Sequence, residues 1–491
     1  MFSSSMRGTA KVVCNLFLLM ALLLASPLPQ VFGQNRNAGE IRGTVTDPSG
    51  AVVPEVMVTL TNTATGVALR AMTGSTGVYA AQSLVPGEYL ITFSKEGFKK
   101  YVRSGVVLHV EVITVDAVME LGSLTQEVTV RGAASLVQTE ESERKELVTS
   151  QMVTELPNVN RQWSYMVGLL PGGNPGTQGQ EIGGPTTGGG AVGLNGSASY
   201  ESNWLVDGGV GMSPASQNTD LLVVPLEAIS EINMTTSNFS AQYGNGLSVF
   251  NVITKSGTNQ WHGSLFEFVQ NDKLNARNFF VPTITPFRWN EFGGSVGGPI
   301  KRDKAFFFFS YQRNPTDTVT PTFYTFPTAA MRNGDFSDPE LPTVYDPATL
   351  TLVNGNYVES PIPGNVVLPS RIDPVAKNIQ SYFPPPNLPG VYNNYLYTGL
   401  SPVTTTYYNG RIDYNISPGD RLTGTFMYVR QNGVQGTTAP ACQIQCTDVA
   451  TQEAQAQITD VWTISPTLIN EFHSSLQRES DVFAPRDKGK G

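Results

Sequence analysis

Apolar and polar positions alternate along several segments between residues 261 and 478, each of about ten residues, the length of a membrane-spanning β-strand. The candidate strands are 261–271, 290–300, 305–312, 407–416, 421–431, 452–464 and 468–478. Tight turns at 301–304 and 417–420 alternate with long connections, the longest of which runs from residue 313 to about 405. Short turns on one side and long loops on the other are what a transmembrane β-barrel needs. The pattern therefore predicts a mainly β chain that contains the first strands of such a barrel.

The segment 407–416 shows the alternation most clearly. Its apolar positions share one face of the strand and its polar positions share the other. The predicted lipid-facing set is Tyr408, Gly410, Ile412, Tyr414 and Ile416, and the opposite set is Tyr407, Asn409, Arg411, Asp413 and Asn415. In the opposite register Arg411 would face lipid, at a cost of about 2–4 kcal/mol near the midplane of the bilayer. We therefore expect Asn409, Arg411, Asp413 and Asn415 to face the interior.

A separate unit is predicted over residues 39–121. Short runs rich in Val, Ile, Thr and Tyr are divided there by turn signals such as Pro48-Ser49-Gly50 and Pro86-Gly87. This spacing is typical of a small antiparallel β-sandwich. In two of the runs every second residue is a core-facing candidate, as in a strand with one buried face. These candidates are Ile41, Gly43 and Val45 in the first run and Val56, Val58 and Leu60 in the second.

Residues 1–33 have the features of a secretory signal peptide. Arg7 and Lys11 supply positive charge, an apolar stretch follows at 12–25, and small residues precede Gln34. The apolar stretch is shorter than the about 20 residues of a membrane-spanning helix, although an uncleaved anchor is the alternative. Export and the candidate strands together predict a location in the outer membrane, with the sandwich in the periplasm.

Composition and motifs give no indication of catalysis. The chain has 31 Lys and Arg against 40 Asp and Glu, a formal net charge of −9, and no basic run, which argues against nucleic acid as a partner. No metal-ligand spacing, phosphate-binding loop or nucleophile motif occurs, so we expect no enzyme activity, no metal and no cofactor. Cys442 and Cys446 are close together in a loop of an exported chain. We expect a disulfide there rather than a metal site, because no His or further Cys lies nearby.

The first unit also resembles a known domain family. The segments that carry the likeness are Gly43-Thr44-Val45-Thr46-Asp47-Pro48-Ser49-Gly50, Gly77-Val78-Tyr79 and Leu84-Val85-Pro86-Gly87-Glu88-Tyr89. They resemble the carboxypeptidase regulatory-like domain. The resemblance implies a transthyretin-like sandwich over 39–121, related to carbohydrate-binding folds, and it implies no peptidase activity.

A second resemblance begins after the sandwich. Its segments include Ser202-Asn203-Trp204-Leu205-Val206-Asp207-Gly208, Ser240-Ala241-Gln242-Tyr243-Gly244, Thr254-Lys255-Ser256-Gly257-Thr258-Asn259 and Phe292-Gly293-Gly294-Ser295-Val296-Gly297-Gly298-Pro299-Ile300. Residues 122–259 resemble the plug domain of TonB-dependent receptors, in particular the Oar-like group, in which a regulatory-like sandwich precedes plug and barrel. Within this unit the charged stretch 140–146 predicts the start of a helix. Residues 260–491 are then expected to be the N-terminal part of the barrel, with one face of 306–309 against the plug. Because barrels of this kind have about 22 strands, we expect the barrel to be truncated in this chain.

The resemblance implies a receptor for an external ligand, a carbohydrate or a peptide, with energy supplied through the periplasmic protein TonB. Glu127, Val128, Thr129 and Val130 form the candidate TonB-contact segment, because alternating β-branched residues suit pairing by strand addition. The other interpretation of this segment is simply the first strand of the plug. The long connection 313–405 and the loop with Cys442 and Cys446 are expected outside the cell. The alternative function is a non-transporting surface adhesin or carbohydrate-binding protein that uses the strands as an anchor in the lipid.

Overall fold

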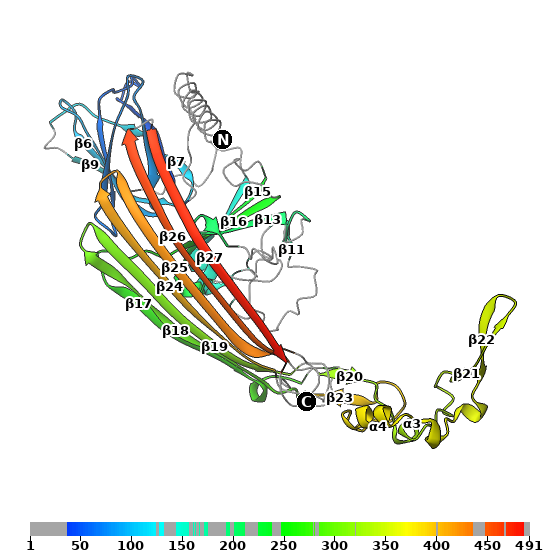
Figure 1. Cartoon of the computed structure of the whole chain (residues 1–491). Coiled ribbons are helices and arrows are strands. Elements are labelled where there is room, and N and C mark those ends of the chain that lie inside the picture. The colour runs from blue at the N-terminus through cyan, green and yellow to red at the C-terminus, as the bar shows by residue number, and fades with distance from the viewer. Residues whose placement is uncertain are drawn as a thin grey trace, which may run out of the picture.

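The computed structural model of the chain shows three parts, which we call the sandwich, the inner unit and the long sheet (Figure 1). The structure describes residues 37–123, 127–131, 144–156, 161, 163, 166, 171–174, 193–196, 201–211, 224–237, 247–277, 279, 284–319, 321–398, 401–435, 447–465 and 468–485. Within these residues no helix has both the length and the apolar character needed to cross a membrane. The predicted signal peptide lies outside the described residues.

The sandwich has two sheets, with strand orders β4-β1-β7 and β3-β2-β5-β6-β9, and β8 also pairs with β1. Its strands are β1 (Gly39–Thr46), β2 (Met57–Asn62), β3 (Ala68–Met72), β4 (Val78–Leu84), β5 (Gly87–Ser94), β6 (Lys100–Leu108), β7 (Val112–Thr114), β8 (Ala117–Val118) and β9 (Glu127–Arg131). Ile41, Val45, Val58 and Leu60 point inward and are fully buried, as the alternation in the sequence predicts. The hydrophobic core therefore lies between the two sheets.

The sandwich is not purely antiparallel, and that part of the sequence prediction is wrong. β1 runs parallel to β7 and β8, and β6 runs parallel to β9. The chain leaves β6 in the second sheet and crosses to the first sheet before β7 begins. A strand that arrives by such a crossover, rather than through a hairpin, can enter in the parallel direction.

The inner unit is built on a sheet with the order β10-β15-β16-β13-β14. Its elements are β10 (Arg144–Thr149), α2 (Ser150–Glu155), β11 (Gly173–Asn174), β12 (Gly193–Leu194), β13 (Ser202–Val206), β14 (Gly209–Val210), η4 (Leu226–Ala228), β15 (Ile229–Ser237) and β16 (Ser248–Thr254). Every residue of β16 is buried, as expected for a central strand covered on both faces. In the core Trp204 stacks on Phe250, with ring centroids 4.0 Å apart.

The helix predicted to start at 140–146 is absent from the residues of this stretch that the structure describes, 144–146. The charged stretch 140–146 is expected to start a helix, but from Arg144 onward the chain forms β10 and pairs antiparallel with β15. Only at Ser150 does a short helix begin, where the Thr149 hydroxyl accepts a hydrogen bond from the Met152 amide. The pairing offered by the edge of β15 overrides the local helix preference.

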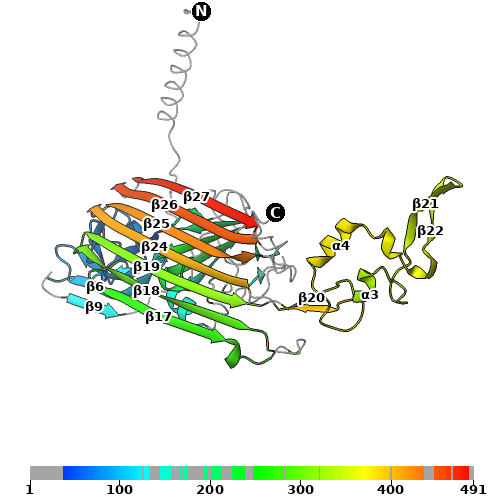
Figure 2. The same ribbon diagram turned by 60° about the horizontal axis from the view of Figure 1, so that its bottom comes forward.

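The long sheet contains seven strands, each antiparallel to its neighbour, in the chain order β17-β18-β19-β24-β25-β26-β27. They are β17 (His262–Asn271), β18 (Phe287–Lys301), β19 (Ala305–Thr318), β24 (Ser401–Ser417), β25 (Asp420–Gln435), β26 (Thr447–Ser465) and β27 (Leu468–Pro485). β24 has 17 residues and β26 has 19, more than the about ten that the sequence predicts. The alternation in the sequence covers only part of β24, whereas its pairing with β19 and β25 continues beyond residue 407 toward the long connections. The inner unit lies against one face of this curved sheet (Figure 2).

The long connection between β19 and β24 forms an excursion that projects from the end of the sheet opposite the sandwich (Figures 1 and 2). It contains β20 (Thr322–Tyr324), α3 (Ala329–Arg332), β21 (Tyr345–Val353), β22 (Asn356–Pro361), η7 (Pro363–Asn365), η8 (Pro369–Arg371), α4 (Pro374–Ser381) and β23 (Tyr395–Tyr397). β21 and β22 form a hairpin, and Arg371 donates two hydrogen bonds, of 2.7 and 2.6 Å, to the Asp346 carboxylate in it. The Arg371 guanidinium lowers the pKa of Asp346 to about 2.

Candidate functional site

The face of the long sheet that meets the inner unit is polar, and its opposite face is apolar. In β24 the side chains of Asn409, Arg411 and Asp413 are buried, whereas Ile412 and Tyr414 between and beside them are exposed. The same alternation continues in the neighbouring strands. Buried polar residues there include Thr425, Gln431, Glu453, Gln455 and Gln457, and exposed apolar residues include Phe426, Ile458, Trp462, Phe472 and Leu476. Asn415, the fourth member of the predicted interior set, is only partly buried.

Arg411 is the centre of a hydrogen-bonded cluster that joins the sheet to the inner unit. Its Nε and Nη2 donate to the two oxygens of Asp413, at 2.8 and 3.0 Å. Its Nη1 donates to Oδ1 of Asp207, at 3.2 Å, and to the carbonyl oxygen of Thr254, at 3.1 Å. Arg411 and Asp207 are 204 positions apart in the chain, and both are buried. A guanidinium in this position is neutralised from both sides, which is what allows it to be buried.

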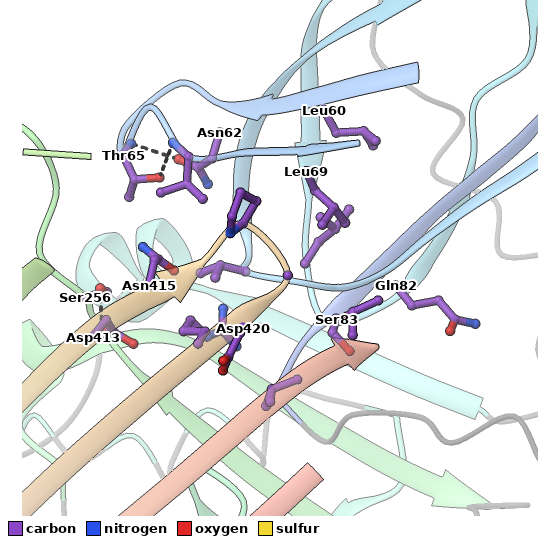
Figure 3. A pocket seen from close by; sticks show the side chains of 18 of the residues that line it. Leu60, Asn62, Thr65, Leu69, Gln82, Ser83, Ser256, Asp413, Asn415 and Asp420 are labelled. Atoms are coloured by element: carbon purple, nitrogen blue, oxygen red, sulfur yellow. Dashed lines mark hydrogen bonds between the residues drawn. The ribbon is translucent and has the colours of Figure 1, made fainter. Parts of the chain in front are cut away.

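Each carboxylate of the cluster has further donors. Asp207 accepts from the amide and the hydroxyl of Thr254, at 3.0 and 2.7 Å. Asp413 accepts from the hydroxyl of Ser256, at 2.6 Å, and from that of Thr423, at 2.9 Å. Figure 3 shows Ser256 and Asp413 next to one another, one from the inner unit's last strand region and one from the long sheet. Amide and hydroxyl donors therefore add to the hydrogen bonds that the single guanidinium gives to the two carboxylates.

Two glutamines of β26 make a second contact with the inner unit. Nε2 of Gln457 donates to the carbonyl oxygen of Val206, at 2.9 Å, and Nε2 of Gln455 donates to that of Val210, at 2.6 Å. Both glutamines are almost completely buried. They supply donors to main-chain oxygens at the β13–β14 turn, next to Asp207.

A third contact is centred on Arg161. Its Nε donates to Oε1 of Glu291 in β18, at 2.7 Å, and its Nη2 pairs with Glu227 of the inner unit. The guanidinium also lies over the ring of Phe268 in β17, 3.7 Å from the ring centroid. Such a stacked cation contributes attraction beyond the ion pairs. Arg161 thus connects β17, β18 and the inner unit.

The sandwich is attached at the end of the long sheet where the short turns lie. Nδ2 of Asn259 donates to the carbonyl oxygen of Thr65, at 2.7 Å, and to Oδ1 of Asp303 in the turn before β19, at 2.6 Å. A cavity of about 80 Å³ separates the two parts nearby (Figure 3). Its lining comes from the sandwich, with Leu60, Asn62, Ser83 and Tyr89, and from the β24–β25 turn, with Pro418, Gly419, Asp420 and Arg421.

The sandwich also contacts the inner unit through a buried carboxylate. Oε2 of Glu231 in β15 lies 2.8 Å from Nδ1 of His109, and Oε1 accepts from the Val110 amide, at 3.0 Å. Glu231 is 2% exposed. The hydrogen bond and the negative charge of Glu231 raise the pKa of His109 above its ordinary value, against the effect of burial. His109 therefore has a structural role, in which it connects the sandwich to the inner unit.

The remaining predicted residues are elsewhere. Glu127, Val128, Thr129 and Val130 lie in β9, which pairs in parallel with β6 at the edge of the sandwich. Cys442 and Cys446 lie outside the described residues, so their predicted disulfide stays a prediction. Phe306 and Phe308 are buried, with Phe308 in the core cluster of the inner unit, as expected for one face of 306–309.

Sequence reasoning missed the inner unit's half of the site. In the sequence analysis Asp207 is only part of a family-like segment and Glu291 only a position in a candidate strand, and neither Glu227 nor Arg161 is assigned a role. The sequence did indicate that Arg411 needs a second carboxylate partner. If Arg411 is buried, Asp413 beside it would otherwise be its sole counter-charge, so a carboxylate from another part of the chain is expected. Nothing in the spacing of residues indicates which carboxylate that is.

Two family models match the chain. The model described as an outer membrane beta barrel domain matches residues 253–491, and the carboxypeptidase regulatory-like domain matches residues 40–120. The chain is 25% identical over 341 residues to the TonB-dependent transporter Oar of Myxococcus xanthus. That match covers 64% of this chain and 29% of the relative, so the chain spans less than a third of the relative's length.

Solved structures of outer-membrane proteins also match parts of the chain, at low identity. The siderophore receptor PirA from Acinetobacter baumannii is 17% identical, with a TM-score of 0.41, over 69% of this chain and 40% of that one. The outer membrane transporter YddB from Escherichia coli is 10% identical, with a TM-score of 0.44, over 69% of this chain and 39% of that one. The two family models and the Oar relative carry the assignment. The chain therefore contains an outer membrane β-barrel domain with a carboxypeptidase regulatory-like domain ahead of it, and it is similar to the TonB-dependent transporter Oar.

Proposed function

We propose that the protein acts as a TonB-dependent receptor and transporter for an external ligand, with the inner unit as the plug of its barrel. The observation that carries the proposal is the cluster in which Arg411 of the sheet holds Asp207 of the inner unit. Side-chain hydrogen bonds and ion pairs make most of the named contacts between these two parts. A polar contact of this kind can be exchanged for contacts with water at a small net cost, whereas separating an apolar interface exposes area in proportion to its size. This suits a body that must shift inside a barrel.

The two ends of the molecule have different roles in this proposal. The sandwich and the short turns lie in the periplasm, where a TonB-type protein pairs with residues 127–130. The excursion 319–400 and the connection that holds Cys442 and Cys446 lie outside, where they contact a carbohydrate or peptide ligand. Exposed aromatic side chains in the excursion support this, because Tyr345 and Tyr357 are at least half exposed. The protein has no enzymatic activity in this proposal.

Labelling of one buried position tests the movement without knowledge of the ligand. Ser310 lies on the inner face of β19 and is 1% exposed. In cells that express the protein, a membrane-impermeant maleimide is expected to label the Ser310→Cys variant when TonB is present and energised. The same variant in cells without TonB is expected to stay unlabelled. Leu352→Cys in the excursion, which is 63% exposed, serves as the control and should react in both cell types.

Labelling of Ser310→Cys at the same rate with and without TonB would contradict the proposal. That result is the one expected of a surface adhesin, because an adhesin has no energised movement of an inner body.

A further inference from the structure

The candidate TonB-contact segment is part of the sandwich. β9 continues the second sheet of the sandwich beyond β6, with Lys100 opposite Glu127, Val102 opposite Thr129 and Arg103 opposite Val130. The strand is therefore ordered by main-chain pairing rather than extended in solvent. The candidate segment and the sandwich are one structural body in this state.

β9 can separate from the sandwich without disrupting the hydrophobic core, because it is an edge strand outside that core. It is the outermost strand of its sheet, and its pairing with β6 covers five residues. The core cluster of the sandwich includes no residue of β9, and the side chains of Thr129 and Val130 are exposed. β6, in contrast, has Val106 and Leu108 in that core and pairs with β5 on its other edge. Removal of β9 would leave four paired strands and an intact core.

Pairing with β6 also limits what β9 can offer to a partner. In a parallel ladder the main-chain groups that face the neighbouring strand are occupied along the whole paired length. A partner strand that needs these same groups must compete with β6, and its apparent affinity falls in proportion to the fraction of chains in which β9 is released.

We propose that the sandwich is an autoinhibitory clamp on the coupling segment: β9 exchanges β6 for a strand of the TonB-type protein when coupling begins. This inference rests on the proposed function, in which residues 127–130 contact TonB. The carboxypeptidase regulatory-like domain then has a role in the timing of transport, beyond any role in binding carbohydrate. Chains in which β9 is held on β6 cannot couple, and those in which it is released can.

A disulfide between β6 and β9 tests the exchange. Arg103→Cys and Val130→Cys are introduced together, because the two positions are direct partners in the ladder. Cys442 and Cys446 are replaced by serine in this background. The full chain in detergent is titrated with the purified periplasmic domain of a TonB-type protein, before and after reduction. We expect the oxidised chain to bind at least about tenfold more weakly than the reduced chain, equal to about 1.4 kcal/mol.

A control pair shows whether oxidation alone matters. Met57→Cys and Met72→Cys are partners at the other end of the same sheet, between β2 and β3, and their disulfide should leave binding unchanged. Equal binding by the oxidised and reduced β6–β9 chains would overturn the clamp, because the TonB domain would then add to β9 without displacing it. Loss of binding by the oxidised control pair as well would also overturn it, since the effect would not belong to β9.

Val128→Pro separates the clamp from the function on which it rests. Proline removes a main-chain donor from β9, so this variant is expected to bind the TonB domain at least about tenfold more weakly than the unaltered chain. Unchanged binding would show that residues 127–130 are not the TonB contact, and it would overturn both the clamp and that part of the proposed function. Weak binding by Val128→Pro with equal binding by the locked and reduced chains would overturn the clamp alone.

Discussion

Replacement of Arg411 by methionine should detach the inner unit from the long sheet. Methionine keeps most of the volume of the arginine stem but removes the guanidinium and its hydrogen bonds to Asp207, Thr254 and Asp413. Asp207 and Asp413 would then remain buried without the cation that pairs with both. Removing one partner of a buried ion pair costs about 3–5 kcal/mol, because the remaining charge is left buried and uncompensated. We expect a loss of this size in the free energy that holds the inner unit in place.

Two further variants give the expected order of effects. Asp207→Asn keeps an oxygen that can accept from Arg411, and Arg411 keeps its paired contact with Asp413, so the cost should be smaller, about 1–3 kcal/mol. Arg302→Met makes the same chemical change as Arg411→Met at an exposed position in the turn before β19. It should change stability by no more than about 0.5 kcal/mol.

Opening of the inner unit can be followed by thiol labelling in urea. Ser202 is 2% exposed, and its hydroxyl lies 2.7 Å from that of Ser248, so Ser202→Cys should react only when β13 is released. Each variant is made in this background, and the urea concentration at half labelling gives the difference in free energy of opening. If Arg411→Met and Arg302→Met opened at the same urea concentration, buried carboxylates left without Arg411 would not destabilise the inner unit in its place, and the argument from the buried ion pair would be wrong.

Three further predictions concern other contacts. Glu231 raises the pKa of His109 above the ordinary 6.5. The stabilisation from the contact between His109 and Glu231 is therefore complete below pH 6.5 and is lost as the pH rises through the raised pKa. The difference in urea midpoint between the unaltered chain and His109→Gln should therefore shrink from acidic to alkaline pH, and a difference independent of pH would contradict the ion pair. Gly257→Ala should cost about 1–3 kcal/mol by urea titration, because its Cβ would lie 2.2 Å from a carbonyl oxygen of β19, whereas Gly410→Ala, with 4.0 Å to the nearest atom, should cost less than about 0.5 kcal/mol. In Arg371→Gln the pKa of Asp346 should rise from about 2 toward 3.8 in an NMR titration, and an unchanged value would show that other groups lower it.

Much of the fold could be predicted because it depends on local periodicity. The inward and outward sets of β24 follow from the alternation at 407–416, since successive side chains of a strand point to opposite faces. The turn after β1 is also local: Asp47 accepts from the amides of Ser49 and Ala51, and Gly50 has a φ of 86°, which suits glycine. These features need only residues that are near one another in the chain.

Local alternation is enough to predict which side of 407–416 is polar and where the short turns lie, but not what the polar side contacts. Arg411 had to face inward, yet only the tertiary structure brings Asp207 and Thr254 to it across 204 and 157 positions of the chain. The same holds for His109 with Glu231, and for β9, whose alternation suits strand pairing but does not name β6 as its partner. The physical reason is that side-chain direction follows from the backbone geometry of each strand, whereas the pairing of distant charges and strand edges is decided when the sandwich, the inner unit and the long sheet pack together.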